Sequence, residues 1–293
     1  MELTRVSERT FCVIGPANVG VIVLDNSRVA LIDSGIDEKY AVRLFELLSD
    51  YRYKIAYIFN THSHADHIGG NAFFNEKCNC RIMASTLEAP TIRQPLIQSA
   101  VLFGGAPVND LMNRFIMAKP SPAEVFNNDE IELGDLKIKI LDLPGHSVNQ
   151  KGFLVDETAF VADTLFLDSF FKKQRLPFNY DPAAHKQTLE KLRRIEAKNW
   201  VGGHFPPQKD IGPMITNNLG HIEIAVEFMR ELLKVPQSHD RIIKSFLDHF
   251  GLKKTNWEYY LYRATVNGYL SALHKRGEIK YKIMDNMPVW YAV

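Results

Sequence analysis

The stretch THSHADHIGG, residues 61–70, is the feature that most limits which fold and function this chain can have. It places four metal-binding side chains within six positions. They are His62, His64, Asp66 and His67, and they directly follow an apolar run of strand length. His62 and His64 are two residues apart, so on extended backbone they project to the same side. Neighbouring imidazoles and a carboxylate lack compensating partners unless they hold a cation. The cluster therefore indicates a metal site.

The other residues of this stretch have supporting roles in the same interpretation. Gly69 and Gly70 are expected to let the backbone pass close to the site. Ser63 and Ala65 alternate away from the ligands, so we expect packing roles for them. Thr61 is expected to give structural support beside the site.

Composition limits the classes of function. The chain has 293 residues, 46% hydrophobic and 24% charged, as in ordinary globular proteins. A formal net charge of +1 argues against attraction of the whole molecule to nucleic acid or to an anionic membrane. No apolar run approaches the roughly 18 residues that span a bilayer, and the first residues do not read as a signal peptide. We expect a cytoplasmic protein that does not bind membranes.

The three cysteines do not supply an alternative metal site. Cys12, Cys78 and Cys80 form no disulfide framework, and a bridge across the single residue Asn79 would be strained. Reduced thiols are the expectation, which leaves metal binding to the histidines and aspartates.

The order of elements predicts an α/β layered protein. The first 235 residues read as two β-rich halves, each ending in a histidine-bearing loop and helices, and the first half contains a strand, helix, strand order. An Asp181-Pro182 pair gives the helix predicted at 182–197 an N-cap and a favourable first residue. Turns are predicted at Asp25–Ser27, Gly134-Asp135 and Asp156-Glu157. The remaining elements are strands at 9–15, 18–26, 28–35, 54–60, 130–145, 152–166 and 199–204, and helices at 37–49 and 217–234.

Two segments interrupt this pattern. Residues 85–125 contain five prolines among apolar stretches, which predicts short helices and loops rather than sheet. Residues 236–293 read as helices followed by a hairpin that turns at Asp285-Asn286, the arrangement of a winged helix. We therefore divide the chain into a catalytic domain, 1–235, and a winged-helix-like domain, 236–293.

Further candidate ligands follow other predicted strands. His146 lies in the turn LPGHS, Asp163 ends the run AFVAD, and His204 ends the run NWVGGH. Layered α/β proteins usually build their sites at the carboxyl ends of strands. We expect these three side chains to join the first cluster.

These motifs, in this order, resemble those of the metallo-β-lactamase fold superfamily. The resemblance rests on the His-x-His-x-Asp-His cluster, PGHS, AD and GGH, with Asp33 in ALIDSG as an upstream motif, and it covers residues 10–210 or so. It implies an αββα sandwich. It also implies that one metal is held by His62, His64 and His146, a second by Asp66, His67 and His204, and that Asp163 bridges both.

The resemblance also implies a catalytic centre. Imidazole and carboxylate ligands suit two divalent ions, zinc first, with iron or manganese as alternatives. The expected chemistry is attack by a metal-bridging hydroxide on an ester-like centre, with Asp66 as the catalytic proton acceptor. Asp33, one strand earlier, is expected to orient ligands by hydrogen bonds.

The substrate stays open between several classes. The motif resembles that of glyoxalase II enzymes, which predicts a small-molecule ester or thioester as substrate. A winged-helix tail resembles instead the lactamase-β-like branch, some of whose members are zinc-dependent endoribonucleases. A third interpretation is a nucleic-acid-binding regulator whose hydrolase core senses a metabolite.

Three further expectations concern partners. Apolar residues of 85–125 are expected either to cap the metal cleft or to pair two subunits as a homodimer. Tyr180 is a candidate substrate contact. Basic residues of the tail could contact phosphates, although its aromatic residues suit packing against the catalytic domain equally well; these basic residues are Lys253, Lys254, Arg263, Lys275, Arg276, Lys280 and Lys282.

Overall fold

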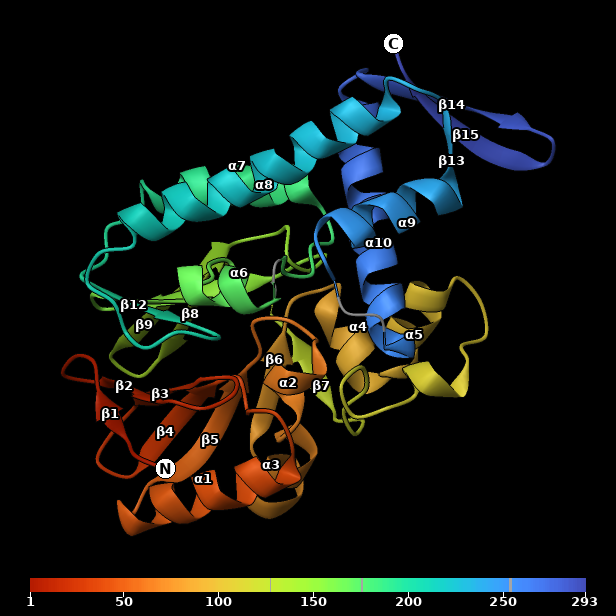
Figure 1. Cartoon of the computed structure of the whole chain (residues 1–293). Coiled ribbons are helices and arrows are strands. Elements are labelled where there is room, and N and C mark those ends of the chain that lie inside the picture. The colour runs from red at the N-terminus through yellow and green to blue at the C-terminus, as the bar shows by residue number, and fades with distance from the viewer. Residues whose placement is uncertain (127, 175, 253–254) are drawn as a thin grey trace.

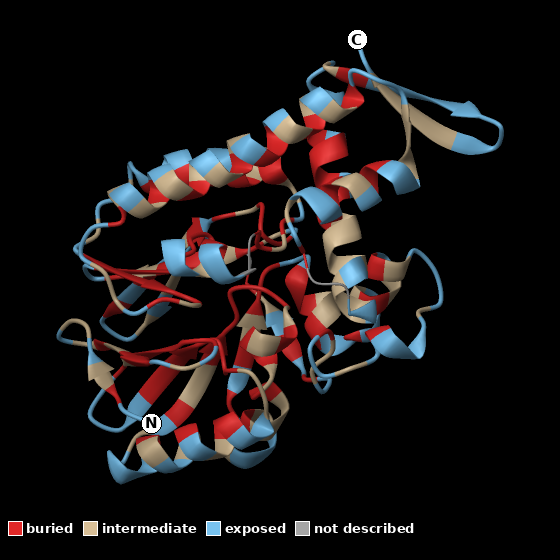
Figure 2. Ribbon diagram, viewed as in Figure 1, coloured by how far each residue is buried: buried red, intermediate tan, exposed pale blue. Residues whose placement is uncertain are grey.

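Two β-sheets face each other, and helices cover the outer face of each (Figure 1). The computed structural model describes residues 1–126, 128–174, 176–252 and 255–293. This αββα layering places both sheets in the core, and Figure 2 shows buried residues along their strands. The predicted sandwich is therefore confirmed as the architecture of the first two thirds of the chain.

The first sheet has seven strands in sequential order. Antiparallel pairing joins the first four strands, and parallel pairing continues to the far edge, where each connection contains helices. The strands are β1 (Thr4–Arg5), β2 (Thr10–Val13), β3 (Val19–Val23), β4 (Arg28–Ile32), β5 (Lys54–Phe59), β6 (Arg81–Ala84) and β7 (Ala123–Val125).

The second sheet has five strands in the order β12-β11-β10-β9-β8. The predicted turns at Gly134-Asp135 and Asp156-Glu157 join antiparallel neighbours. The last strand runs parallel to β11, which brings the segment after it to the same edge as the residues after β11. The strands are β8 (Glu130–Leu133), β9 (Leu136–Asp142), β10 (Lys151–Val155), β11 (Thr158–Ala162) and β12 (Asn199–Gly202).

Successive side chains of a strand point to opposite faces of its sheet, and this alternation divides the core into layers. On β4, Leu31 packs in the cluster shared with the outer helices, whereas its neighbour Ile32 packs in the cluster between the sheets. Phe59, Phe153 and Phe160 fill that inner layer. The helices that flank the first sheet are α1 (Glu38–Asp50), α2 (Ala65–Ile68) and α3 (Asn71–Cys78), and those beside the second sheet are α6 (Asp168–Gln174), α7 (Pro182–Leu192) and α8 (Gly212–Leu233).

Two predicted helix starts are confirmed. Asp37 caps α1 by accepting a hydrogen bond from the amide of Tyr40, and Asp181 caps α7 through the amides of Ala183 and Ala184. The predicted end of α7 at residue 197 is wrong, because the helix ends at Leu192. The chain must turn there, since the amides of residues 198 and 199 bond to the carbonyl of Glu157 and so begin β12 beside β11.

Residues 85–125 form the short helices α4 (Glu88–Arg93), α5 (Leu96–Phe103) and the 3₁₀ turn η1 (Asn109–Leu111), as predicted. The expectation that this segment contributes no sheet is wrong. Its last residues form β7, which extends the first sheet by parallel pairing with β6. The hydrophobic residues Leu102, Leu111 and Ile116 pack against Trp257 and Leu261 of the tail.

The tail contains α9 (His239–His249), α10 (Asn256–Lys275) and a small antiparallel sheet in the order β13-β15-β14. Those strands are β13 (Gln237–Ser238), β14 (Ile279–Met284) and β15 (Met287–Ala292), and the predicted turn at Asp285-Asn286 joins the last two. One hydrophobic cluster runs from the second sheet through α8 into α9 and α10. Lys253 and Lys254 lie outside the described residues.

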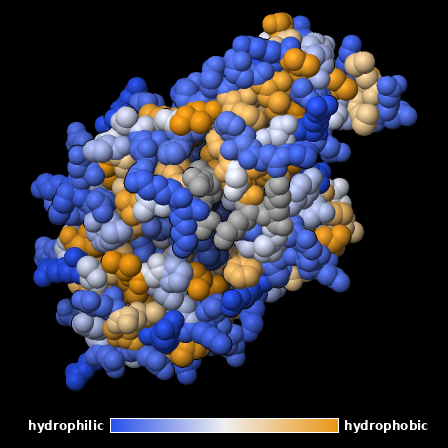
Figure 3. Space-filling model, in the orientation of Figure 1, coloured by the Kyte–Doolittle hydropathy of each residue, from blue (hydrophilic) through white to orange (hydrophobic). Residues whose placement is uncertain are grey.

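The surface has a mixed character. On the face in Figure 3, hydrophobic groups are interspersed with hydrophilic side chains, and one group lies over the tail. Among the residues that the structure describes, no helix has both the length and the apolar character that crossing a membrane requires.

Candidate metal centre

Three imidazoles form the first group of converging nitrogen atoms. His62 Nε2 and His146 Nε2 each lie 3.0 Å from His64 Nδ1. Nitrogen ligands of a tetrahedral zinc ion, at bonds of about 2.0–2.1 Å, are about 3.3 Å apart. All three side chains are buried or half-buried, and they come from the loops after β5 and β9. The geometry is that of three ligands around one ion.

Asp66, His67 and His204 form the second group. His204 Nε2 lies 3.4 Å from Asp66 Oδ2, and His67 Nε2 lies 3.8 Å from the same oxygen. Asp66 and His67 sit on the one-turn helix α2, whereas His204 follows β12 of the other sheet. The two sheets therefore each contribute ligands to this position.

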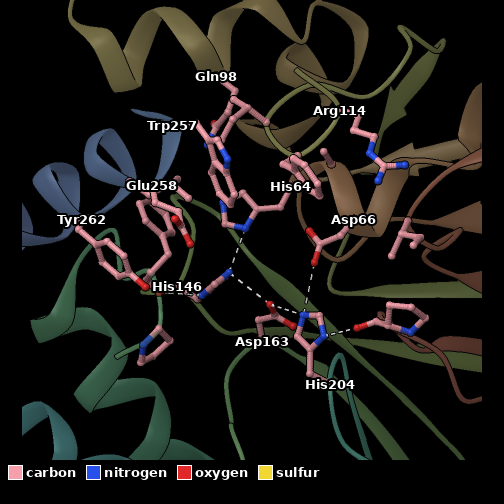
Figure 4. A pocket seen from close by; sticks show the side chains of 18 of the residues that line it. His64, Asp66, Gln98, Arg114, His146, Asp163, His204, Trp257, Glu258 and Tyr262 are labelled. Atoms are coloured by element: carbon pink, nitrogen blue, oxygen red, sulfur yellow. Dashed lines mark hydrogen bonds and ion pairs between the residues drawn. The ribbon is translucent and has the colours of Figure 1, made fainter. Parts of the chain in front are cut away.

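Asp163 lies between the two groups. Its Oδ1 is 3.3 Å from His67 Nε2, and its Oδ2 is 3.2 Å from His204 Nε2 and 3.5 Å from His146 Nε2. The carboxylate therefore faces imidazoles of both groups, which is the position that a bridging ligand requires. Figure 4 shows Asp163 between His146 and His204. The structure thus brings together all seven side chains that the sequence singled out.

Two atoms of this cluster indicate that its buried polar groups are not all paired unless a cation is bound. His67 Nε2 and Asp163 Oδ1 are buried and make no hydrogen bond within the described part of the chain. Buried polar atoms are rarely left without a partner. The donor set, imidazole and carboxylate with no thiolate, fits divalent transition metals. The residues therefore fit a two-metal centre.

The electrostatics divide the histidines into two kinds. Burial lowers the pKa of His62 and His64 and lowers that of His146 to about 3, so these three imidazoles are neutral. Burial also opposes charge on His204, but Asp163 and Asp66 outweigh it and raise the His204 pKa to about 10. The pKa of His67 is raised for the same reason. In the cluster without metal, His67 and His204 therefore carry the protons that face Asp66 and Asp163, and Asp33 adds a third carboxylate at His67.

A hydrogen-bond chain behind the ligands orients two of the imidazoles. Asp33 Oδ2 accepts from His67 Nδ1 at 2.8 Å and from Thr61 Oγ1 at 2.8 Å. Thr61 Oγ1 in turn accepts from His62 Nδ1 at 3.0 Å. Asp33 thereby fixes one ring in each group, because a bond at the inner nitrogen sets which nitrogen faces the metal. Asp33 adopts a left-handed backbone conformation, with φ of 62°.

Backbone carbonyls fix two other rings. His146 Nδ1 donates to the carbonyl of Phe178 at 3.0 Å, and His204 Nδ1 donates to the carbonyl of Pro16 at 2.6 Å. In both residues Nε2 is the nitrogen that faces the centre. These bonds also connect the centre to the loop before α7 and to the loop between β2 and β3.

Glu88 is a supporting residue that sequence reasoning missed. Its Oε2 accepts from the amide and hydroxyl of Ser63, and its Oε1 accepts from Ser147 Oγ and the amide of Asn149. This buried carboxylate on α4 therefore joins the loop of His62 and His64 to the loop of His146. The predicted packing role of Ser63 omits these bonds. A glutamate in an amphipathic segment gives no sequence signal for such a role.

The glycine that passes closest to the ligands is not one of the two predicted. A Cβ on Gly69 or Gly70 would collide with backbone of residues 34–37, so these glycines allow α2 to pack against the turn after β4. A Cβ on Gly203 would lie 2.0 Å from Asp163 Oδ1. Gly203 is therefore the residue whose missing side chain leaves room for the bridging carboxylate.

A cavity of about 460 Å³ opens above the centre and is lined by His64, Asp66, His146, Asp163 and His204. Most of its wall is aromatic or aliphatic, and α10 supplies one side (Figure 4). Phe115 stacks on Trp257 at a ring-centroid distance of 5.3 Å, which joins the 85–125 segment to the tail at this wall. The principal apolar wall residues are Phe115, Phe166, Phe178, Trp257, Leu261 and Tyr262.

Tyr180 lies outside this cavity. Its side chain is exposed and lines a second cavity of about 520 Å³, which adjoins the first along His64, Gln98 and Phe178. His185 belongs to neither ligand group, and it is buried between Asn179 and the carbonyl of Thr164. A substrate contact by Tyr180 stays a prediction.

Comparison with known proteins agrees with this geometry. The profile of the Metallo-beta-lactamase superfamily matches residues 13–204. Hydroxyacylglutathione hydrolases of Rhodopseudomonas palustris (strain BisB18) and Nitrobacter hamburgensis are 28% and 29% identical over 151 residues. These matches cover 51% of this chain and 48% of each relative, so the chain matches about half the length of these curated relatives.

Solved structures match over nearly the whole chain. A metallo-beta-lactamase family protein from Thermus thermophilus has a TM-score of 0.73 at 18% identity and covers 97% of this chain and 98% of its own. A beta-lactamase domain protein from Burkholderia ambifaria has a TM-score of 0.74 at 13% identity, with coverage of 100% and 94%. At these identities the likeness establishes the fold, including the tail, and nothing beyond it.

Proposed function

Because the chain belongs to the metallo-β-lactamase superfamily, we propose that it is a two-metal hydrolase of small esters or thioesters. The observation that carries this proposal is the convergence of seven ligand side chains, five of which line the floor of a largely apolar cavity. A catalytic site needs a substrate space beside its metals, whereas a structural metal site is closed. Zinc is the proposed metal, with iron and manganese as alternatives.

The two ions, when bound, would supply an ionised water and a Lewis acid for the developing oxyanion. The chain's own residues do the rest. Asp66 is half-exposed to the cavity, and although burial raises its pKa, His67 and His204 lower it below the ordinary value. Asp66 is therefore ionised at neutral pH, and its position beside the reacting group, rather than its basicity, makes it the proposed proton acceptor.

The cavity wall supports a small acyl substrate over a polyanion. Its aromatic side chains exclude water and pack against apolar groups, and Arg114 is its one basic residue apart from the ligand histidines among the described residues. Hydroxyacylglutathione hydrolases, by their name, hydrolyse hydroxyacyl-glutathione, and their distant similarity supports an ester-like bond as the target. Because that similarity spans half of either chain, we carry over the bond class and not glutathione.

Zinc-dependent endoribonuclease activity and metabolite-regulated nucleic-acid binding are the alternative proposals, and both rely on a winged-helix tail. The tail has the elements of such a module, with α9, α10 and a small sheet. However, α10 lines the cavity and packs against α5 and α7, so one face of this helix is already engaged. This packing favours a tail that completes the hydrolase.

One experiment separates the three proposals. The purified protein would be assayed against acyl thioesters, lactones and short RNAs, with metal analysis of the same preparation. We expect hydrolysis of thioesters or esters with bound zinc, and little change between about 50 and 200 mM salt. Cleavage or binding of RNA that weakens steeply over that range would favour an alternative, because phosphate contacts are strongly salt-dependent.

A further inference from the structure

The second cavity adjoins the cavity above the reaction centre. It shares His64, Gln98 and Phe178 with the first cavity, and it leads away from His64 between α5 and α10. We call it the side groove. A molecule whose reacting group lies at the metal ligands could therefore extend into it without leaving the surface of the protein.

One wall of the side groove is apolar and faces solvent. Five of the large apolar side chains that line it are exposed, and they come from the turn before α4, from α5 and from two loops. Exposed apolar side chains are ordinary when scattered, but a contiguous group beside a site indicates binding. The five are Leu87, Ile97, Val101, Val148 and Tyr180.

The helix α10 lines another part of the groove with small and polar residues. Gly268 allows this helix to approach the 179–182 segment closely, because a Cβ there would lie 2.7 Å from the carbonyl oxygen of Tyr180. Asn267 and Lys275 lie at the rim, where each is already engaged, Asn267 with His239 and Lys275 with Asp181. The side groove therefore presents an apolar strip, and the polar side chains named at its rim already have partners within the protein.

We propose that the side groove holds the alkyl part of an acyl chain, so that the substrates are esters or thioesters of medium or long unbranched acids. This inference rests on the proposed function. An alkyl chain needs no hydrogen-bond partner, and each methylene that leaves water on the apolar wall strengthens binding. Because both cavities reach His64, a molecule with its carbonyl at the centre would pass this side chain and place its alkyl chain in the groove.

Alkyl hydroxamates test the groove without requiring turnover, because their head group chelates metals. Binding of the four- to eight-carbon hydroxamates to the zinc-loaded full-length protein would be measured by calorimetry. We expect the affinity to rise about two- to fourfold per methylene. Val101→Asp, at a position that is 65% exposed and tolerant of change, should flatten this rise. Ile224→Asp on α8, 53% exposed and away from both cavities, should not.

The outcomes are distinct. An affinity independent of chain length, or a rise that Val101→Asp leaves intact, would overturn the side-groove proposal. A change in molar mass of Val101→Asp in light scattering, with the rise intact, would instead assign this wall to contact with a second copy. Chain-dependent hydroxamate binding without hydrolysis of any ester or thioester would refute the proposed function and still support the groove.

Discussion

Asp33 Oδ2 lies 2.8 Å from His67 Nδ1 across thirty-four residues of sequence, and the same oxygen accepts from the hydroxyl that holds His62. One carboxylate therefore orients an imidazole in each metal-binding group. Its position at the end of β4, next to the parallel strand β5, makes this possible, since the residues after both strands meet at one edge of the sheet.

Replacing Asp33 should weaken metal binding more than it weakens the fold. Asp33→Asn keeps the volume but loses the charge and one acceptor, so the rings of His62 and His67 lose their orientation. We expect metal affinity to fall by about 10- to 100-fold, measured by competition with a chelating dye. Asp50→Asn, at an exposed position in the last turn of α1, is the matched control and should leave the affinity unchanged. Equal affinities for all three proteins would contradict the orienting role.

His64→Ala should remove the nitrogen that both His62 and His146 approach at 3.0 Å. We expect loss of bound metal and a fall in turnover of about a hundredfold or more, because changes outside the ligand set alone cost about 10- to 100-fold. Metal analysis and ester hydrolysis would be measured together. His274→Ala, at an exposed position in the last turn of α10, serves as control. Full activity of His64→Ala would refute the assignment of the centre.

Metal binding should release protons. Before an ion binds, His204 carries a proton at pH 7, since Asp163 and Asp66 raise its pKa to about 10 against the effect of burial, and the pKa of His67 is raised as well. An ion needs their lone pairs, so about two protons should leave per protein at pH 7. Metal affinity should therefore increase as pH rises from about 6 to 8. Calorimetry in buffers of different ionisation enthalpy measures the release, and an affinity that is flat with pH would contradict it.

Glu88→Gln should destabilise the protein although it conserves shape. The buried carboxylate accepts four hydrogen bonds, and an amide in its place turns a donor toward other donors. We expect the free energy of unfolding in urea to fall by about 2–3 kcal/mol. Glu124→Gln, whose exposed side chain pairs with Arg81, should change it by less than about 0.5 kcal/mol. A similar small effect at both positions would show that Glu88 does not join the two ligand loops energetically.

A pair of helical glycines tests how the tail is held. Gly220→Ala on α8 should stabilise the protein by about 0.5–1 kcal/mol, because no described atom outside its own helix turn lies within 4 Å of the new Cβ. Gly268→Ala on α10 should instead destabilise it by about 1–3 kcal/mol, since its Cβ would meet the carbonyl of Tyr180 at 2.7 Å. Denaturant unfolding measures both. Stabilisation by both substitutions would mean that α10 does not dock tightly on the 179–182 segment.

The ligand positions could be predicted from the sequence because they depend on local rules. His62 and His64 are two residues apart on extended chain, and His146, Asp163 and His204 each follow a recognisable strand. Asp181 and Pro182 start α7 for an equally local reason. These features need no knowledge of distant contacts.

The features that the sequence did not predict depend on contacts between distant segments. Glu88 joins two loops that only the closed sandwich brings together, and Trp257 reaches the cavity wall only because α10 docks there. The strand β7 forms because β6 offers a free edge, and α7 stops early because β12 must start beside Glu157. In each example the tertiary partner decides a residue's role, and no local pattern encodes that partner.

The docking of α10 against the reaction cavity has a consequence for how such a protein can diversify. Trp257, Leu261 and Tyr262 face the space above the ligands, yet they lie more than fifty positions beyond the last of them, His204. Substitutions at these three positions can change which substrates enter the cavity, while the loops that carry the metal ligands stay unchanged. Selection for a new substrate could thus act on codons distant from those of the ligands and leave the metal-binding residues inherited intact.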